Sequence, residues 1–413
     1  MRILYIVTAF PRHSGEVMTP WLIETIGRLR ARGVDVEVLA PSYRGSGDQV
    51  VDGTRVHRFR YAPALLETLT HDQTTPDRLR ERPAYLGLVP GYVAAGSIAA
   101  ARLARTGRFD AVHAFWPLPH GLLGLAARAI TGVPLVSTFF GVELTWARRH
   151  LPFLTPLLRA IIRRSDAVTV ISSYTGGEVR VLVPEVKVRT IPFGAASESH
   201  AMGATRRDES RGAGEQRLLF VGRLVERKGV DVLLRALATL RVDRDVRLTV
   251  VGDGPLRPAL EGLAVEVGVR DAVEFTGTVS QEELRRRYAG SDIFVLPAVR
   301  DRKGDVEGLG VVLIEALQYE LPVVASESGG IPDVVEDGRT GLLVPPGDTD
   351  ALASAIGRLI EDPELARRLA RAGREDVAVR FSWDRIVTEL MTLYEDVRRS
   401  DAGSPADGTE GWA

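Results

Sequence analysis

Two glutamates eight positions apart are the residues of this sequence best suited to chemistry. Glu307 precedes the glycine-bearing run 308–310, and Glu315 lies within the apolar run 311–318. The glycines predict a loop, and the apolar run predicts a helix that opens directly from it. The first turn of a helix carries unpaired N–H groups and the positive end of the helix dipole, so it suits a phosphate. Glu315 would lie about one turn into the helix, a rise of roughly 6 Å.

Carboxylates at that separation can accept hydrogen bonds from hydroxyl groups on either side of a bound diphosphate. Sugar nucleotides have this layout, because a diphosphate joins their ribose to their sugar. The alternative interpretation is a glycine loop before an ordinary helix, with Glu315 exposed to solvent. Short motifs of this kind also occur by chance, so the neighbouring motifs decide between the two.

A second loop suited to phosphate follows the strand-like run 217–221. Gly222 would let the backbone approach a ligand closely. Arg223 can bind phosphate oxygens with two parallel hydrogen bonds, and Lys228 adds a compact positive charge. Isolated cations are usually surface residues, but their place at the carboxyl end of a strand indicates phosphate binding. Similar strand-and-glycine units occur at 250–255, 275–279 and 328–332.

These loops belong to two stretches in which strand-like and helical patterns alternate. The first stretch has expected strands at 3–8, 34–40, 111–113, 135–139 and 167–171, with helices at 19–32 and 121–130. The second stretch begins at 217 and runs to 341–344. This alternation predicts two α/β domains, each with a doubly wound parallel sheet. Ligands of such sheets bind outside the carboxyl ends of the strands.

The expected domain boundaries follow from composition. Residues 196–216 are small and polar without periodicity, which predicts a linker, and the stretch 399–413 predicts a disordered tail. Residues 44–85 hold one strand-like run and several prolines, which predicts a long loop or lid. The prediction is therefore an N-terminal domain 1–195, the linker 196–216, a C-terminal domain 217–382, a helix 383–398 and the tail 399–413.

The overall composition fits an intracellular protein of two domains. The chain has 413 residues, 45% of them apolar and none of them cysteine, so disulfides and thiolate metal sites are excluded. The N-terminal apolar run is too short for a secretory signal, and the longest uncharged run, 86–101, is shorter than a membrane span needs. We therefore expect a cytoplasmic protein. Residues 1–195 carry a net charge of +9 and the remainder −10, which is consistent with an anionic partner for the first half. The alternative is that the uneven distribution of arginines has no functional meaning.

The order of the motifs resembles a known family. VGRLVERKG, VVGDGP, FTGTVS, Glu-x7-Glu, ASESGGIPDVVEDGRTGLLVPPGD and FSW follow one another along the second half of the chain. In this the chain resembles the retaining glycosyltransferases of family four, over residues 1–398 and most strongly in the C-terminal half. The resemblance implies the GT-B fold, in which two Rossmann-like doubly wound domains face a central cleft. It also implies that the helix 383–398 packs back on the first domain.

The resemblance implies a role for each matching residue. Arg223 and Lys228 would hold the diphosphate and stabilise the leaving nucleotide. Glu315 would bind the ribose hydroxyls, and Glu307 the hydroxyls of the donor sugar. The other donor-binding residues that it implies are Gly15, Gly222, Val279, Gly308, Leu309, Gly310 and Val311. Relatives often have two glycines at the place of Gly15, whereas this chain has one.

The N-terminal half departs from the family at one position. Relatives often have a histidine after the strand that corresponds to 136–139, and it contacts the donor sugar near carbon 6; here Phe140 stands in its place. Phenylalanine offers no hydrogen bond, so we expect a donor altered at carbon 6 or a shifted sugar pose. Alternatively His120, expected on a strand-to-helix loop, supplies the missing group and counts as a catalytic residue. His113 is expected to be buried.

The chemistry that the resemblance implies is transfer of a sugar from a nucleoside diphosphate to an acceptor, with retention of configuration. Cations and a helix start would neutralise the diphosphate, so neither metal nor cofactor is expected, and the mechanism would be front-face attack. Two alternatives stay open: a sugar-nucleotide epimerase on the same fold, and a non-catalytic nucleotide-sugar-binding protein. The sequence does not identify the nucleotide base, the sugar or the oligomeric state.

The acceptor is left open between a small molecule and a membrane lipid-linked glycan. The segment 144–164 mixes aromatic and leucine residues with five arginines, which could contact an anionic membrane surface at the inner face of the membrane. An ordinary helix with an apolar core face explains the same pattern. Nucleic acid is not expected, since no platform of basic and aromatic residues is present.

Overall fold

A computed structural model describes residues 1–16, 18–71, 78–79, 82–194 and 214–402. The chain divides into two compact units. Unit 1 comprises residues 1–171, 176–191 and 386–402, and unit 2 comprises residues 172–175, 192–194 and 214–385 within the described ranges. Most of the expected linker, residues 196–213, and most of the expected tail, residues 403–413, lie outside the described residues.

Unit 1 is built on an eight-stranded sheet whose strands run parallel, except for one strand at its edge. Its strands are β1 (Arg2–Ile6), β2 (Asp35–Pro41), β3 (Gln49–Val51), β4 (Thr54–Phe59), β5 (Ala111–Phe115), β6 (Leu135–Phe139), β7 (Ala167–Val170) and β8 (Val188–Thr190). The sheet order is β3-β4-β2-β1-β5-β6-β7-β8, and only β3 pairs antiparallel, with β4. The strand order reverses between β1 and β5, which is the switch point of a doubly wound sheet.

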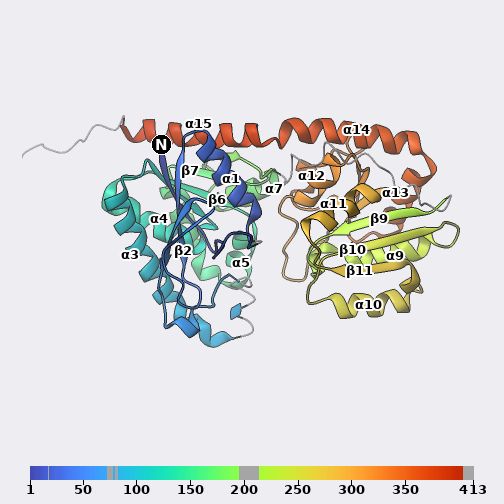
Figure 1. The fold of residues 1–413 in the computed structure, drawn as a ribbon, viewed down its shortest axis with the longest axis horizontal. Helices are drawn as coiled ribbons and strands as arrows, with labels where there is room; N and C mark the ends of the chain where they lie inside the picture. The colour runs from blue at the N-terminus through green and yellow to red at the C-terminus, as the bar shows by residue number, and fades with distance from the viewer. Residues whose placement is uncertain (17, 72–77, 80–81, 195–213, 403–413) are drawn as a thin grey trace, which may run out of the picture. The chain divides into compact units, whose positions relative to one another are not determined.

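Helices cover both faces of this sheet (Figure 1). They are α1 (Pro20–Ala31), α3 (Val89–Gly107), α4 (Pro117–Thr131), α5 (Val142–His150), α6 (Thr155–Arg164) and most of α7 (Ser173–Leu182), with short 3-10 turns η1 (Ala64–Leu66), η2 (Pro83–Leu88) and η3 (Pro152–Leu154). The helix α3 was not foreseen in the sequence. Pro90 lies in its first turn, where proline is tolerated because that N–H has no helical partner.

Among the described residues, one helical stretch, Pro83–Gly107, is long and apolar enough to cross a membrane, by length and composition only. Within unit 1 it packs against α4, where a Cβ on Gly96 would lie 2.5 Å from Leu123. Tyr92, Ala100 and Ala104 of α3 join the main hydrophobic cluster of the unit. One face of the stretch is therefore a core face of unit 1.

Unit 2 is built on a six-stranded parallel sheet of the order β11-β10-β9-β12-β13-β14. Its strands are β9 (Gln216–Val221), β10 (Val246–Val251), β11 (Val273–Gly277), β12 (Ile293–Leu296), β13 (Val323–Ser326) and β14 (Leu342–Val344). Its helices are α9 (Val230–Leu240), α10 (Arg257–Glu266), α11 (Gln281–Gly290), α12 (Val311–Gln318), α13 (Thr349–Glu361) and α14 (Pro363–Arg380), with the 3-10 turns η4 (Glu226–Lys228), η5 (Arg270–Ala272) and η6 (Ile331–Asp333). The strand order reverses between β9 and β12, and both units confirm the predicted doubly wound class.

Five helices of unit 2 begin in one of two ways. Ser280, Asp348 and Asp362 cap α11, α13 and α14 by accepting hydrogen bonds from the first turn. By contrast, α9 and α12 begin at Gly229 and Gly310, which have left-handed backbone (φ 64° and 84°) and no side-chain cap. The first N–H groups of these two helices are therefore left for another partner.

The last helix, α15 (Trp383–Ala402), is tied to unit 1 by a buried chain of hydrogen bonds. The Tyr394 hydroxyl lies 2.8 Å from the Tyr5 hydroxyl and 2.7 Å from His113 Nδ1. His113 Nε2 lies 2.6 Å from the Thr138 hydroxyl. Burial lowers the pKa of His113 to about 3, so its ring is neutral in this network. The expectation that His113 is a buried, satisfied residue is confirmed.

Candidate active site

The loops at the carboxyl edge of the unit 2 sheet hold most of the residues that the sequence singled out. Arg223 and Lys228 follow β9, and Glu307 follows β12, so they flank the place where the strand order reverses. Ligands of doubly wound sheets bind at this switch point. The helix α12 opens from the Glu307 loop over the predicted range, Val311–Gln318, and Glu315 is its fifth residue.

Lys228 and Glu307 form a buried ion pair in this edge. Lys228 Nζ lies 2.7 Å from Glu307 Oε2, and the two side chains are only 9% and 12% exposed. Burial alone would raise the pKa of Glu307, but the charges of Lys228 and Arg227 and hydrogen bonds from Lys228 and the Gly310 backbone hold the pKa below its usual value. The carboxylate is thus ionised and ready to accept hydrogen bonds from hydroxyl groups.

Two glycines after β13 bring a second loop against the Glu307 loop. The Gly330 N–H donates to the Glu307 carbonyl at 2.9 Å. A Cβ on Gly330 would lie 2.1 Å from the Gly308 carbonyl oxygen, and one on Gly329 would lie 2.0 Å from that of Glu307. Only glycine permits this approach, so backbone rather than side chains lines this part of the edge.

Glu315 is held by a residue that the sequence did not single out. The Tyr288 hydroxyl, on α11, donates to Glu315 Oε2 at 2.8 Å. Tyr288 is stacked on Tyr319, with ring centroids 5.2 Å apart. Burial raises the pKa of Glu315, and the hydrogen bond from Tyr288 opposes that rise. Tyr288 leaves the other carboxylate oxygen for a second donor such as a ribose hydroxyl. The sequence of α11 is mostly charged, so nothing in it indicated that Tyr288 would be buried against Glu315.

The remaining expected residues of unit 2 lie on loops of the same edge. Arg223 is exposed, Val279 is half-buried in the loop between β11 and α11, and Leu309 is buried to 3% exposure. The Leu309 side chain therefore belongs to the core, and its backbone alone could face a ligand. The donor-binding roles of Arg223, Val279 and Gly222 stay predictions.

Comparison with known proteins gives a family match in each half of the chain. Residues 203–376 match the family "Glycosyl transferases group 1", and residues 23–194 match "Glycosyl transferase 4-like domain". A GDP-mannose-dependent alpha-(1-6)-phosphatidylinositol monomannoside mannosyltransferase of Mycobacterium tuberculosis is 31% identical over 397 residues, which is 94% of this chain and 97% of that protein. The chain belongs to the family-four glycosyltransferases. It is an enzyme that uses a nucleotide sugar.

Other relatives of this glycosyltransferase differ in what they are named for. The N-acetyl-alpha-D-glucosaminyl L-malate synthase of Bacillus anthracis is 29% identical over 319 residues, 76% of this chain and 81% of that protein. Among solved structures, a sucrose-phosphate synthase from Thermosynechococcus elongatus matches with a TM-score of 0.76 and 26% identity, over 97% of this chain and 99% of that one. These matches support the GT-B fold that the sequence predicted.

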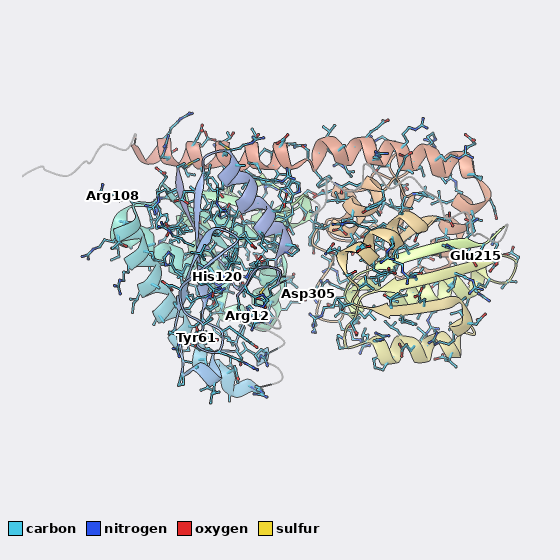
Figure 2. All side chains as sticks on the ribbon, in the orientation of Figure 1. Arg12, Tyr61, Arg108, His120, Glu215 and Asp305 are labelled. Atoms are coloured by element: carbon cyan, nitrogen blue, oxygen red, sulfur yellow. The ribbon has the colours of Figure 1, made fainter. Side chains whose placement is uncertain are left out.

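The glycosyltransferase places His120 differently from the expectation. His120 lies in the first turn of α4, not on a loop, and is 1% exposed in the interior of unit 1 (Figure 2). Its Nδ1 lies 2.7 Å from the Phe115 carbonyl oxygen and must donate, so Nε2 accepts from the Tyr92 hydroxyl at 2.9 Å. Burial lowers its pKa to about 4. Both ring nitrogens are engaged, and a catalytic role for His120 stays a prediction that its contacts do not favour.

Gly15 is the other donor-binding residue expected in unit 1. It has left-handed backbone with φ 81° in the exposed turn after β1, and a Cβ there would meet no atom within 4 Å. The positive φ, rather than a close approach, is thus the reason for glycine at this position. A role for Gly15 in donor binding stays a prediction.

Phe140 is part of an aromatic cluster at the carboxyl edge of the unit 1 sheet. Its ring is stacked on Trp116 with centroids 4.0 Å apart and an angle of 13°. Trp116 has left-handed backbone, with φ 50°, which is uncommon for a bulky residue. Trp21 lies 5.8 Å from the Phe140 ring. The family histidine position is therefore filled by a ring that packs, rather than by one that offers a hydrogen bond.

Glu143 is a buried acid that the sequence analysis passed over. Its Oε1 accepts the Phe140 N–H at 2.8 Å, while Oε2 is buried with no hydrogen-bond partner in the described part of the chain. Burial raises the pKa of Glu143 to about 7, against the opposing effect of three backbone hydrogen bonds. The motif Gly141-Val142-Glu143 after a strand was the available signal, but nothing in it reports burial.

The segment 144–164 uses its apolar face inside the glycosyltransferase. Leu144, Ala147, Leu158 and Ile162 belong to a hydrophobic cluster of unit 1 and are at most 1% exposed. Phe153, 72% exposed, is the large apolar side chain of this segment that faces solvent. The pattern that suggested a membrane surface is therefore explained mainly by core packing.

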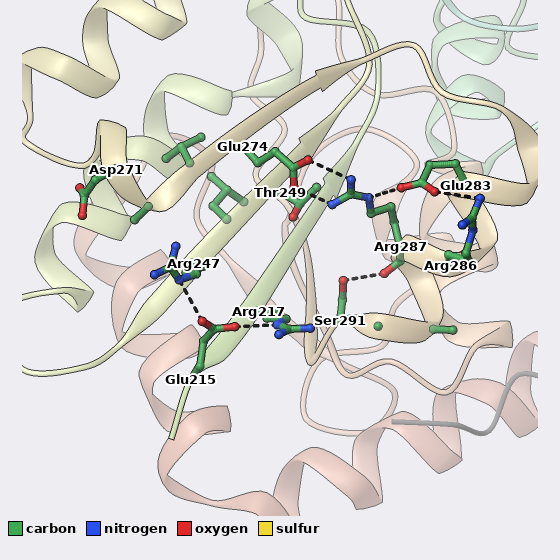
Figure 3. Close-up of a pocket in the computed structure, with 15 residues that line it drawn as sticks. Glu215, Arg217, Arg247, Thr249, Asp271, Glu274, Glu283, Arg286, Arg287 and Ser291 are labelled. Carbon is green, nitrogen blue, oxygen red and sulfur yellow. Dashed lines mark hydrogen bonds and ion pairs between the residues drawn. The ribbon is translucent and has the colours of Figure 1, made fainter. Parts of the chain in front are cut away.

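A pocket of about 700 Å³ in unit 2 lies away from these glycine loops (Figure 3). Its lining residues come from the starts of β9, β10 and β11, at the amino edge of the sheet, and from α11 and the residue that follows it. Arg217 and Arg247 pair with Glu215 at 2.7 and 2.9 Å, and Arg287 pairs with Glu283 at 2.7 Å. Glutamates that line the pocket thus neutralise these arginines. The pocket is also not lined by the uncapped N-terminus of a helix, which would favour a diphosphate.

Proposed function

We propose that this glycosyltransferase transfers a hexosyl group from a nucleoside diphosphate sugar with retention of configuration and without a metal ion. The observation that carries the proposal is the buried Lys228–Glu307 pair at the switch point of unit 2, directly before the uncapped start of α12. In the proposed complex the diphosphate lies at this helix start. Lys228 then serves two anions, the carboxylate that orients the sugar and the phosphate that leaves with the nucleotide.

Each residue of the edge has a distinct task in the proposed reaction. Arg223 and the first N–H groups of α12 stabilise charge as the bond between sugar and diphosphate breaks. Glu307 orients the sugar through its hydroxyls, and Glu315, steadied by Tyr288, binds the ribose. The acceptor oxygen attacks from the face that the nucleotide leaves, and a donor phosphate oxygen takes its proton. The chain itself supplies position and charge rather than a nucleophile.

We propose a guanine nucleotide as the first donor to test, because the mycobacterial relative named above is GDP-mannose-dependent. Thermal unfolding would be followed with GDP, UDP, ADP and dTDP, each with and without EDTA. A ligand that binds only the folded state raises its stability by RT ln(1 + [L]/Kd), so the preferred nucleotide should stand out. We expect GDP to give the largest shift, with no effect of EDTA, and the shift to disappear in Glu315→Ala.

The reaction type needs a second experiment. NMR of the product formed from an α-linked nucleotide sugar would show an α linkage if the enzyme retains configuration, and a β linkage would refute that part of the proposal. Conversion of the donor into another sugar nucleotide without acceptor would instead establish the epimerase. Nucleotide binding without transfer to any acceptor would establish a binding protein.

The acceptor of the proposed reaction is a lipid-linked glycan or a small anionic metabolite, the two classes that the relatives' names contain. We propose that the enzyme works in the cytoplasm and contacts membranes at most peripherally, through unit 1. Arg159 and Arg163 line a small basic hollow on α6, and Phe153 is exposed on the same segment. Co-sedimentation with phosphatidylglycerol vesicles, lost in Phe153→Ser with Arg163→Gln, would test this contact. Equal sedimentation of the double variant would refute it.

A further inference from the structure

A charged cluster in unit 1 has no part in the proposed donor site. Loops that follow three neighbouring parallel strands converge in it: Arg12 and Glu16 follow β1, Tyr43 follows β2, and Arg58 and His71 come from the end of β4 and the chain beyond it. The cluster therefore lies at the carboxyl edge of the unit 1 sheet, where ligands of such sheets bind.

Arg58 is the unusual member of this cluster. The side chain belongs to a residue that is only 6% exposed. Its Nη2 donates to the carbonyl oxygens of Phe10 and Pro11 at 2.9 and 2.7 Å. Its Nε and Nη1 are buried without a hydrogen-bond partner in the described residues. A buried guanidinium with two unused nitrogens is costly. These N–H groups therefore need an acceptor that the described residues do not supply.

The Glu16 carboxylate lies among the basic side chains of the cluster. Glu16 accepts from the Arg12 guanidinium and backbone N–H at 2.5 and 2.6 Å and lies 3.1 Å from His71 Nε2. Despite burial, the hydrogen bonds from Arg12 and His71 lower the pKa of Glu16 to about 2. Glu16 is therefore anionic, and the exposed Asp48 carboxylate, which accepts the Arg58 backbone N–H at 2.8 Å, adds a second negative charge beside Arg58.

Tyr43 holds the Arg12 and His71 side chains beside Glu16. His71 is stacked on the Tyr43 ring at 4.6 Å, and the Arg12 guanidinium lies over it at 5.1 Å. His71 has a left-handed backbone, with φ 91°. Such strain persists where surrounding contacts impose it, and it is concentrated at binding sites. A rigid wall of this kind suits a compact, multiply charged ligand.

We propose that Arg58, Arg12 and His71 form an oxyanion subsite that binds a phosphoryl group carried by the acceptor, and that Glu16 occupies this subsite until the acceptor arrives. A phosphoryl group offers more acceptor oxygens than a carboxylate, so it can satisfy the unused Arg58 nitrogens as well as Arg12. The net charge of +9 on residues 1–195 agrees with an anionic acceptor. The inference rests on the proposed transferase function, because it names the chemistry of the second substrate.

The test uses inorganic phosphate as the probe and thermal unfolding of the full chain as the readout. Wild type is compared with Arg58→Gln and with Arg55→Gln, a matched loss of one guanidinium from an exposed side chain of the same strand. Each titration is run with and without GDP, because phosphate can also bind at the donor edge of unit 2. We expect phosphate to stabilise wild type and Arg55→Gln, and Arg58→Gln to weaken this binding about tenfold or more.

Equal phosphate stabilisation of Arg58→Gln and Arg55→Gln would overturn the proposal, as would its absence in wild type. If Arg58→Gln fails to fold, Arg12→Gln removes a more exposed cation of the same cluster and must weaken phosphate binding too. Stabilisation by GDP that is unchanged in every variant shows that the proposed donor site is intact. Loss of the GDP effect alone would count against the proposed function and leave the phosphate result readable.

Two further measurements distinguish a free metabolite from a lipid headgroup as the carrier of the phosphoryl group. Glycerol 3-phosphate represents a free metabolite, and phosphatidylcholine vesicles with and without phosphatidylinositol represent a lipid headgroup. Vesicle binding that depends on phosphatidylinositol and is lost in Arg58→Gln identifies a lipid acceptor. Competition by glycerol 3-phosphate without vesicle binding identifies a free acceptor. Sodium acetate that stabilises as well as phosphate does would show a carboxylate site and overturn the assignment to phosphoryl groups.

Discussion

Both sheets of this enzyme are doubly wound and reverse their strand order once, yet their carboxyl edges are built from different chemical groups. In unit 2 the edge is mostly backbone, because Gly229, Gly310 and Gly330 let loops approach where a Cβ would collide or strain. In unit 1 the corresponding edge is side chains: Trp116 stacked on Phe140, and Glu143 beneath them. The unit 2 edge therefore offers backbone N–H groups to a ligand, and this part of the unit 1 edge offers a packed side-chain surface.

This difference between backbone and side chains determines which part of a substrate each edge can recognise. A diphosphate has the same geometry in every sugar nucleotide, so an edge made of backbone N–H groups and one ion pair can bind it whatever the sugar. Side chains vary without changing the fold, and an edge built from them can discriminate among sugars or acceptors. Tests of this division begin with the ion pair of unit 2.

Lys228→Ala should have the largest effect. It would leave the Glu307 carboxylate buried without its 2.7 Å partner. Removing one member of a buried pair typically costs about 3–5 kcal/mol, and loss of one charge-stabilising donor lowers kcat about 100- to 1000-fold. Urea unfolding and steady-state transfer rates would measure both. Arg302→Ala, the loss of a cation with a 92% exposed side chain, should change stability by less than about 1 kcal/mol. Similar effects of both variants would contradict the catalytic importance of the pair.

Glu143 should make the stability of unit 1 depend on pH. Burial raises its pKa in the folded state to about 7, whereas an unfolded glutamate has a pKa of about 4.3. The folded state therefore holds a proton that the unfolded state has lost between these values. The resulting stabilisation is complete below about pH 4.3 and is lost as the pH rises through 7, a change of about 4 kcal/mol.

Glu143→Gln should remove this dependence, because the amide oxygen can still accept the Phe140 N–H and no charge is buried at high pH. Urea unfolding of both proteins at about pH 5 and about pH 8 would check it. We expect Glu143→Gln to gain stability over wild type only at the higher pH. Glu361→Gln, which removes an exposed carboxylate, serves as the control. An equal difference at both pH values would show that Glu143 does not titrate in this range.

Gly330→Ala tests the backbone construction of the unit 2 edge. The new Cβ would lie 2.1 Å from the Gly308 carbonyl oxygen, so one of the two loops must shift. Forced repacking of this kind costs about 1–3 kcal/mol, and nucleotide binding should weaken about tenfold. Gly262→Ala, at a helical position with open space around it, should leave binding unchanged. Unaltered nucleotide affinity of Gly330→Ala would show that the two loops adjust independently of the ligand.

Much of the fold was open to prediction because its pattern is local. The alternation of apolar runs gave both parallel sheets, and the glycine loop gave α12 with its bounds. The helix α3 was missed because its proline and glycines lower helix propensity, whereas burial of Tyr92 and Ala100 against α4 stabilises it. Tertiary packing decided that element, and a sequence read alone does not report packing.

The candidate site was predictable where motifs fix backbone and less so where partners come from afar. Lys228 and Glu307 were both expected in the site because they belong to a recognised order of motifs, but their ion pair was not expected. Tyr288 lies 27 positions before Glu315 and reaches it only through the sheet. Likewise, His120 was placed on a loop because its burial by Tyr92 depends on the unforeseen helix α3.

Phe140→His probes the side-chain edge and should have the smallest effect on the fold. A histidine ring can keep the stack on Trp116, so unfolding free energy should change by less than about 1.5 kcal/mol. If Phe140 selects a donor without an oxygen at carbon 6, the histidine should favour the 6-hydroxyl donor over its 6-deoxy counterpart about tenfold, the value of one hydrogen bond. The ratio of kcat/KM for the two donors measures this. Phe140→Leu, which removes the ring without adding a donor, should leave that ratio unchanged. An unchanged ratio in Phe140→His would mean that the residue at position 140 does not distinguish donors by the oxygen at carbon 6. The side chains of the unit 1 edge would then select the acceptor rather than the donor sugar.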